Sequence, residues 1–88
     1  MLNVEYTNAF KKSYVLCVKR KYDMEALKKV MDILTNQQPL PKRHRDHKLK
    51  GNFLNCRECH IKGDWLLIYR YEPQTIIFED TGTHSDLF

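Results

Sequence analysis

Residues 65–71, WLLIYRY, decide the fold of this chain. All but one of them are apolar or aromatic, and an apolar run of this length between turn residues predicts a strand buried on both faces at the centre of a sheet. Turn-forming segments bracket it at residues 62–64 (KGD) and 72–74 (EPQ). Residues 55–61 and 75–80 are therefore predicted to be its antiparallel neighbours.

Upstream of these strands the chain predicts one more strand and two helices. Apolar and polar residues alternate over residues 2–6, which is typical of a half-buried strand. Thr7 and Asp23 can each cap a helix whose apolar residues recur at spacings of three and four. A short link predicts that the helices pack as an antiparallel hairpin, and residues 82–88 are expected to add a last helical turn. The predicted fold is α+β in a single domain, residues 1–88: an N-terminal strand and a helix hairpin packed on a small, mostly antiparallel sheet, in the order β-α-α-β-β-β.

Residues 36–51 break this pattern. Pro39 and Pro41 disfavour regular structure nearby, and the segment is polar and basic. A long surface loop is therefore predicted, and long loops in small domains are often functional. Its cations are Lys42, Arg43, Arg45, Lys48 and Lys50. Because Asp46 is the only acidic residue among them, contact with phosphate is predicted for this segment.

The composition fits a small folded protein with a basic surface. Hydrophobic residues make up 42% of the 88 residues, which is enough for one modest core. Fifteen Lys and Arg against eleven Asp and Glu give a net charge of +4, which favours nucleic acid, the ribosome or an acidic protein as partner. No apolar run is long enough for a membrane helix, and the first residues do not resemble a signal peptide. A cytoplasmic protein without membrane contact is expected.

Residues 56–60 match the Cys-x-x-Cys-His spacing of covalent haem attachment. Such attachment follows export, for which the sequence shows no signal. Cys56 and Cys59 also fall in a predicted strand, where residues three apart point to opposite faces; this opposes a shared haem, a local disulfide and a shared zinc. Together with Cys17 they fit reduced thiols, and no cofactor or metal is expected. A metal-binding or redox module built on Cys56, Cys59 and His60 stays open as an alternative.

Three histidines and a carboxylate suggest acid–base chemistry. His47 lies in the basic loop, His60 ends a predicted strand, and His84 follows another. His60 and Asp64 flank the turn of a predicted hairpin and are expected to approach each other. Any one of them alone is most simply a polar surface residue. Together with nearby Lys and Arg they match the needs of metal-free RNA cleavage, which are a base for the 2′-OH, an acid for the leaving 5′-oxygen and cations for the phosphorane.

Two aromatic residues allow two interpretations. Trp65 follows a turn directly, and Phe88 is the last residue. Either can belong to the core. Alternatively, each can stack on an unpaired base, a contact worth about 1–3 kcal/mol in single-stranded RNA binding.

Three segments carry a more specific signal in combination than any of them does alone. They are Asp46–Gly51 (DHKLKG), Arg57–Tyr69 (RECHIKGDWLLIY) and Thr81–Phe88 (TGTHSDLF). With these segments, and in its length and element order, the whole chain closely resembles the YafQ branch of the RelE toxin superfamily. The resemblance implies a RelE-like fold and a toxin of a type II toxin–antitoxin system.

The resemblance further implies an mRNA interferase that enters the ribosomal A site and cleaves the codon there. Such an enzyme uses the 2′-OH as internal nucleophile, leaves a 2′,3′-cyclic phosphate and a 5′-OH, and requires no metal. The partners it implies are the ribosome, mRNA and a cognate antitoxin. The antitoxin is expected to wrap the basic surface with an acidic, partly helical segment and to bind operator DNA.

Position by position, His47 matches the general base of the family and His84 the general acid. His60 and Asp64 match residues that support proton transfer and hold the substrate. The aromatic positions around the nucleotide are matched by Trp65 and Phe88. Chemistry alone leaves the roles open, because base and acid can be exchanged between His47 and His84, or Asp64 can take one of them.

One position departs from the family pattern. Relatives usually carry Arg four residues before the histidine of the Thr-Gly-Thr-His segment, whereas this chain has Asp80. Losing one charge-stabilising group can cost about 10²–10³ in rate. Either Lys48, Lys50 or Arg57 supplies the charge at the substrate, or Asp80 turns away, or the enzyme is slow. The rival prediction is a catalytically weak homologue that acts mainly as antitoxin-binding partner and operon co-repressor.

Overall fold

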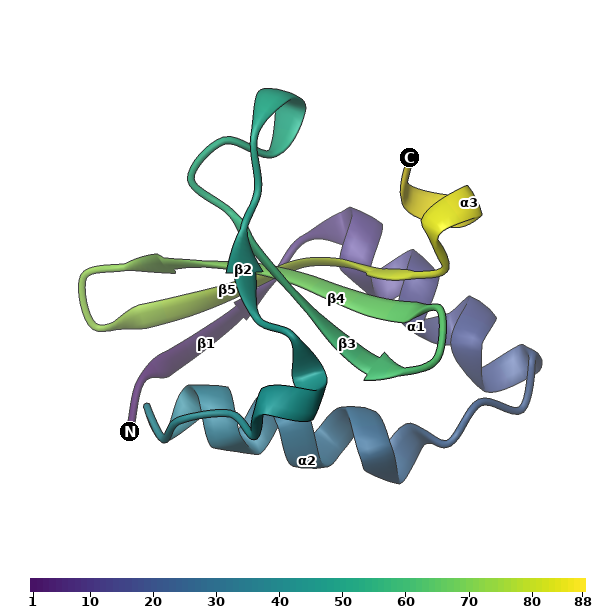
Figure 1. Ribbon diagram of the computed structural model, residues 1–88, viewed down its shortest axis with the longest axis horizontal. Helices are drawn as coiled ribbons and strands as arrows, with labels where there is room; N and C mark the ends of the chain where they lie inside the picture. The colour runs from purple at the N-terminus through teal and green to yellow at the C-terminus, as the bar shows by residue number, and fades with distance from the viewer.

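The computed structural model describes residues 1–88 as a five-stranded sheet with two long helices against one face (Figure 1). The elements are β1 (Asn3–Tyr6), α1 (Asn8–Lys19), α2 (Met24–Thr35), the 3-10 helix η1 (Lys42–His44), β2 (His47–Lys48), the 3-10 helix η2 (Gly51–Phe53), β3 (Arg57–Lys62), β4 (Trp65–Glu72), β5 (Thr75–Gly82) and α3 (His84–Leu87). The strand order is β1-β5-β4-β3-β2, with β1 parallel to β5 and the other neighbours antiparallel. The predicted α+β fold with a mostly antiparallel sheet is confirmed. None of the helices is long and apolar enough to span a membrane.

β4 lies at the centre of the sheet, between β3 and β5, as its apolar run predicts. Residues 65–69 are all buried. Their side chains alternate, so that the odd-numbered ones join the core beneath the helices and the even-numbered ones face the opposite side. The prediction that the whole run is buried is wrong at its end. Tyr71 is 46% exposed because β4 continues there beyond the last residue that pairs with β3.

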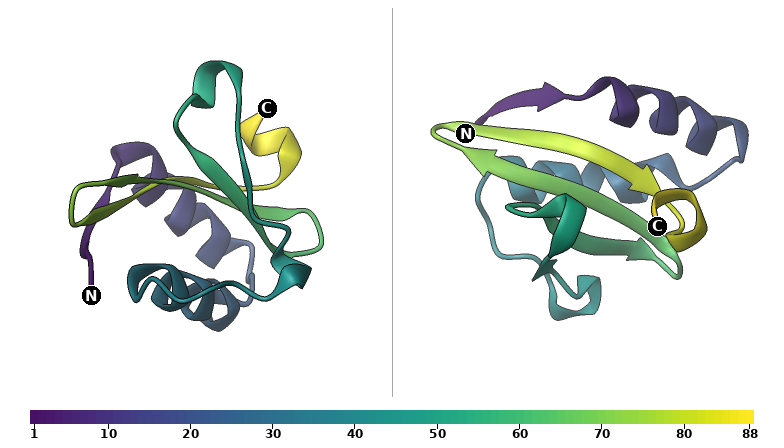
Figure 2. Two further views of the ribbon diagram at one scale, coloured as in Figure 1. Left: turned by 60° about the vertical axis from the view of Figure 1, so that its left-hand side comes forward. Right: turned by 90° about the horizontal axis from the view of Figure 1, so that it is seen from above.

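Both predicted helix caps are present. The Thr7 side chain accepts a hydrogen bond from the N–H of Phe10 (3.0 Å), and the Asp23 side chain accepts one from the N–H of Ala26 (3.3 Å). α1 and α2 follow each other as a helix hairpin on one side, while the loop containing η2 and the short α3 rise from the other side (Figure 2). The core between helices and sheet consists of Phe10, Cys17, Leu27, Val30, Leu34, Cys59, Ile61, Trp65, Leu67, Tyr69, Ile76 and Phe78.

The segment 36–51, predicted to be an irregular loop, contains short regular elements. Its two-residue strand β2 pairs with β3 in the register His47↔Glu58 and Lys48↔Arg57. This pairing attaches the basic segment to the edge of the sheet. A two-residue strand is too short to leave an alternating pattern in the sequence, which is why the pattern does not predict it.

Candidate active site

Three histidines from different elements form a row on the sheet face opposite the long helices, which we call the histidine row. The ring centroids of His47 and His60 lie 6.5 Å apart, and those of His60 and His84 lie 6.1 Å apart. The sheet register explains the row. His47 pairs with Glu58, two residues before His60, and His60 and Gly82 pair with the same residue of β4. His84 follows Gly82 by two residues, so it reaches the row from the neighbouring strand.

Asp64 holds His84 in place. Its carboxylate accepts hydrogen bonds from His84 Nδ1 and from the His84 backbone N–H, the latter at 3.2 Å. These hydrogen bonds hold the pKa of Asp64 below its usual value. Because Nδ1–H points to the carboxylate, Nε2 is the ring nitrogen left for a substrate. The hydrogen-bond partner of the Asp64 carboxylate is thus His84, whose ring lies next to that of His60.

The helical turn α3 presents His84 as its first residue. Thr83 and Asp86 form a capping box, in which each side chain accepts from the backbone N–H of the other. Arg20, at the end of α1, donates to the same Asp86 carboxylate at 2.7 and 3.1 Å. Gly82 leads into the turn with a φ of 153°, and a Cβ there would lie 2.9 Å from an Asp86 carboxylate oxygen. These contacts fix a single turn that could not hold its position by its own hydrogen bonds.

Backbone contacts fix the two histidines that precede β3 in the chain. His47 Nδ1 lies 2.7 Å from the carbonyl oxygen of Arg45. A carbonyl oxygen can only accept, so Nδ1 carries the hydrogen and Nε2 of the neutral ring has a free lone pair. The His47 side chain is 51% exposed, which leaves Nε2 accessible. His44, by contrast, is buried, and its Nδ1 donates to the carbonyl oxygen of His60 at 2.6 Å, which ties η1 to β3.

Phe88 extends the histidine row at the His84 end. Its ring lies 6.2 Å from that of His84 and packs edge-on against Phe53 of η2 at 5.4 Å. The side chain is 62% exposed, so one of its faces is available to a flat ligand. The placement fits the predicted contact of Phe88 with a base.

Trp65 lies in the core. It is 5% exposed, packs against Tyr22 at 4.9 Å between ring centroids, and donates from Nε1 to the Thr81 hydroxyl at 2.9 Å. The odd-numbered positions of β4 point toward the helices, which is why this ring faces away from the histidine row. The structure thus matches the core interpretation of Trp65 and leaves no ring face on which a base could stack.

The predicted phosphate-binding cations are not brought into the histidine row. Lys48 and Arg57 pair across β2 and β3, next to the His47 pair, and adjacent strand residues point to opposite faces. Arg57 is also engaged by Asp46, whose carboxylate accepts from its Nε at 3.2 Å. Lys48 and Lys50 are exposed. These cations therefore lie beside the histidine row and not within it.

Asp80 is engaged by α1. Its carboxylate accepts from the Ser13 hydroxyl and from the N–H of Thr81, the latter at 2.9 Å. Phe78 and Asp80 pair with consecutive residues of β4, so β5 has a bulge just before Asp80. Of the three explanations for an acid at this position, the structure supports a carboxylate that is turned toward α1.

Sequence reasoning misses two residues beside the row. Glu58 lies two positions before His60 on the same strand, so both side chains point to the same face, and that spacing was a usable signal. Phe53 is an aromatic residue in a polar, glycine-containing loop. Its contact with Phe88 depends on the path of the loop over the sheet, for which no sequence signal exists.

The cysteines do not join the site. Cys56 and Cys59 are both buried, and burial raises the pKa of the Cys59 thiol to about 12. Cys59 belongs to the core beneath the helices, whereas its neighbour His60 faces the other side of the sheet. No three His, Cys, Asp or Glu side chains are grouped as metal ligands would be.

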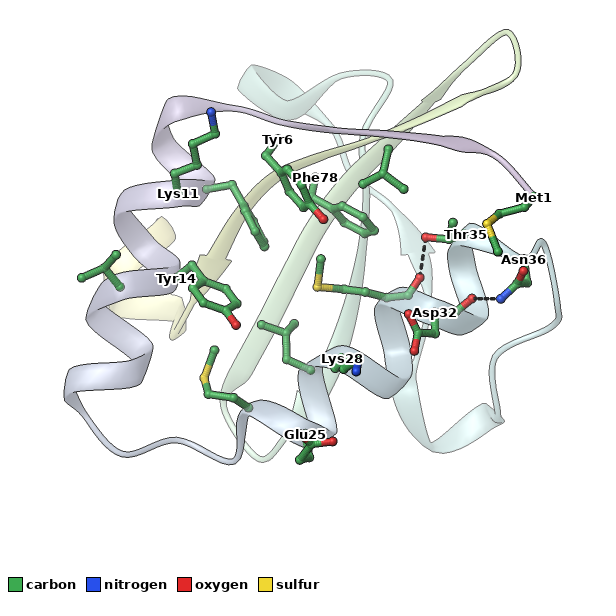
Figure 3. A pocket seen from close by; sticks show the side chains of 16 residues that line it. Met1, Tyr6, Lys11, Tyr14, Glu25, Lys28, Asp32, Thr35, Asn36 and Phe78 are labelled. Atoms are coloured by element: carbon green, nitrogen blue, oxygen red, sulfur yellow. Dashed lines mark hydrogen bonds between the residues drawn. The ribbon is translucent and has the colours of Figure 1, made fainter.

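The largest groove of the molecule, about 730 Å³, lies on the helix side, and we call it the helix groove. It is bounded by β1, α1 and α2, and Figure 3 shows Tyr6, Tyr14 and Phe78 pointing into it. None of the predicted site residues lines it. Other hollows of similar size are lined by site residues: His60 lines one of about 710 Å³, and Lys48 and Arg57 line one of about 720 Å³. The apolar helix groove is therefore separate from the predicted site residues.

The chain is similar over nearly its full length to known toxins. A family model described as "Bacterial toxin of type II toxin-antitoxin system, YafQ" matches residues 2–88. The mRNA interferase toxin YafQ of Escherichia coli (strain K12) is 40% identical over 87 residues, which cover 98% of this chain and 95% of that protein. The crystal structure of YafQ from E. coli strain BL21(DE3) superposes with a TM-score of 0.94 at 38% identity, covering 100% of this chain and 99% of that one. YafQ in the crystal structure of the E. coli DinJ-YafQ complex superposes with a TM-score of 0.91 at 39% identity and the same coverage. The chain therefore belongs to the YafQ family of bacterial type II toxin–antitoxin toxins.

Proposed function

We propose that this protein is an mRNA interferase, an endoribonuclease that cuts ribosome-bound mRNA in the A site without a metal. The histidine row is the observation that carries the proposal. At its two ends His47 and His84 each use Nδ1 for a fixed hydrogen bond and leave Nε2 for the substrate. The name of the E. coli relative, mRNA interferase toxin YafQ, supports the same activity.

In the proposed reaction His47 Nε2 accepts the proton of the 2′-OH while the 2′-oxygen attacks phosphorus. The bond from phosphorus to the 5′-oxygen breaks, and His84 donates a proton from Nε2 to that leaving oxygen. The products are a 2′,3′-cyclic phosphate and a 5′-OH. Asp64 orients the His84 ring and balances its charge, and His60 lies between base and acid, where the phosphate would sit. The reverse assignment exchanges the roles of His47 and His84.

The substrate contacts follow from the surroundings of the row. Phe88, supported by Phe53, offers an exposed ring on which a base of the codon can stack. Lys48, Lys50 and Arg57 bind the RNA backbone or the ribosome beside the scissile phosphate. Trp65 supports the site from the core.

A cognate antitoxin is the proposed inhibitor, as DinJ forms a complex with YafQ in E. coli. α1 carries three lysines and no acidic residue, and its Val15 and Val18 side chains are 51% and 49% exposed. An acidic, amphipathic segment would match such a surface in both charge and polarity. Binding of operator DNA would then belong to the antitoxin of the complex.

The second candidate is a weak enzyme that serves mainly as antitoxin-binding partner and operon co-repressor. Asp80 favours it, because no cation stands at this position and the carboxylate is bound by Ser13.

Cleavage of a defined mRNA on programmed ribosomes, beside the same mRNA free in solution, separates the two candidates. The wild type is expected to cut only ribosome-bound mRNA. His84→Ala should reduce the rate by at least about 10²-fold, as removal of a general acid does. Lys12→Ala, a change on the far side of the molecule, serves as the matched control and should cut like the wild type.

Circular dichroism of each variant distinguishes a folding defect from a catalytic defect. Intact mRNA with folded wild-type protein would contradict the enzyme proposal and favour the co-repressor.

A further inference from the structure

Glu58 is a buried carboxylate placed between two histidines of the row. Its side chain is 5% exposed, and its two oxygens lie 3.8 Å from His47 Nε2 and 3.9 Å from His60 Nε2. Both distances exceed a direct hydrogen bond and lie within the range of an ion pair. The carboxylate thus faces the same ring nitrogen of each histidine and nothing closer.

His47 and His60 are the cation-forming side chains within ion-pair distance of Glu58. Across β2 it faces His47, and across β4 it faces Ile68, which is apolar. On its own strand the same face carries His60, whereas Arg57 and Cys59 point to the opposite side. The carboxylate makes no hydrogen bond to another side chain or to the backbone, and its oxygens keep some contact with solvent. In this mostly buried position a nearby positive charge stabilises it, and the two imidazoles lie within ion-pair distance to supply one.

The tautomer of His47 strengthens the case for a positive charge beside the Glu58 carboxylate. Its Nδ1–H is directed to the carbonyl oxygen of Arg45, so in the neutral ring Nε2 presents a lone pair to the carboxylate, which is repulsive. A proton on Nε2 converts that repulsion into an ion pair. The same holds for His60 when its Nε2 lacks a proton. A single proton placed between the carboxylate and either imidazole removes this repulsion.

We propose that Glu58 is a positioning residue of the proposed cleavage reaction, in which it shares one proton with His47 and His60. One imidazole then stays neutral to accept the 2′-OH proton, while the other is charged and faces the phosphate. When the 2′-oxygen bonds to phosphorus, both imidazoles carry a proton and the Glu58 carboxylate balances the added charge. His84 protonates the 5′-oxygen as its bond to phosphorus breaks, so protons balance across the step. This inference rests on the proposed function for its catalytic meaning and on the geometry alone for the shared proton.

The shared proton is tested by ¹⁵N NMR of the histidine rings in the full chain and its Glu58→Gln variant. In the variant, the Nε2 signal of at least one of His47 and His60 is expected to move, because the carboxylate that faces these nitrogens has lost its charge. His84, whose ring is held by Asp64, serves as the internal control, and its ring signals should stay unchanged. Unchanged Nε2 signals for both His47 and His60 would overturn the inference, whatever the enzyme does.

The catalytic meaning is tested on programmed ribosomes over a range of pH. Glu58→Gln should lower the maximal rate about tenfold or more and displace the acid limb of the profile. Glu58→Asp keeps the charge on a shorter side chain and should restore part of the rate and the original limb. A uniform loss at every pH would mean that Glu58 is merely structural and would overturn the positioning role. If the wild type itself does not cut, the proposed function fails while the NMR result still stands.

Discussion

Asp80 stands where the family resemblance implies an arginine, and its contacts determine what a substitution should do. Ser13 and the N–H of Thr81 bind the carboxylate at the side of α1. Asp80→Ala should therefore leave the cleavage rate close to that of the wild type. Asp80→Arg adds a cation near the developing phosphorane and should raise the single-turnover rate on ribosomes about tenfold or more. An unchanged or lower rate in a folded Arg variant would show that no cation is missing.

The sequence predicts which residues belong to the candidate site better than it predicts which of them contact each other. The chemistry of RNA cleavage selects His47, His60, His84 and Asp64 from the sequence, and the structure places them together. The partner of Asp64 could not be predicted, because the direction of a side chain at a hairpin turn depends on the element that packs over it. Trp65 shows the same limit, since an apolar run does not reveal which of its members faces the site.

Among the elements, α3 depends most on contacts outside itself. Hydrogen bonds from Arg20 hold the pKa of the Asp86 carboxyl well below its usual range. A carboxyl with a depressed pKa in the folded state stabilises the protein above its unfolded pKa of about 3.9, and this contribution is lost as the pH falls through the folded value. Asp86→Asn should thus lower the urea midpoint at pH 7, and the difference from the wild type should shrink below about pH 4.

Two further variants isolate the ion pair in that experiment. Arg20→Gln removes the partner and keeps the capping box, so it should reproduce most of the pH-dependent loss. Lys12→Gln removes a charge from the same helix without an ion pair and should behave as the wild type. A difference between wild type and Asp86→Asn that stays constant from pH 7 to pH 3 would show that the carboxylate charge does not anchor α3.

Long elements were predictable and short ones were not. α1 and α2 carry apolar spacing and caps, Thr7 and Asp23, that act within the sequence itself. β2 has two residues and exists because β3 offers it an edge, so its cause lies outside its own sequence. The bulge before Asp80 is of the same kind, because an extra residue in β5 is visible only against the register of β4.

For the whole molecule, the net charge of +4 predicts binding that weakens with salt. Affinity for the ribosome should fall linearly with salt on logarithmic axes, with a slope of about 0.7–0.9 per phosphate contact. Lys48→Ala and Lys50→Ala should each make the slope shallower by about that amount. The measurement is made in a His84→Ala background, so that the mRNA stays intact, and Lys12→Ala is the control. Equal slopes in all variants would show that Lys48 and Lys50 are not part of the RNA-binding surface.

For the whole molecule, the sequence predicts that helices cover a sheet, but it does not predict which strands lie side by side. One hydrophobic face per helix and a doubly buried strand require helices on a sheet, and the structure has them. That β1 lies parallel beside β5 follows from the path of the chain through two helices, about which side-chain periodicity carries no information.

The sheet separates two surfaces that a chemist could address independently. The helix groove has a volume in the range of small-molecule sites, whereas the histidine row lies open on the other face. A drug-sized compound seated in the groove would leave every catalytic side chain uncovered. If the antitoxin occupies the same groove, such a compound would release the enzyme instead of inhibiting it, and would halt bacterial growth by activation.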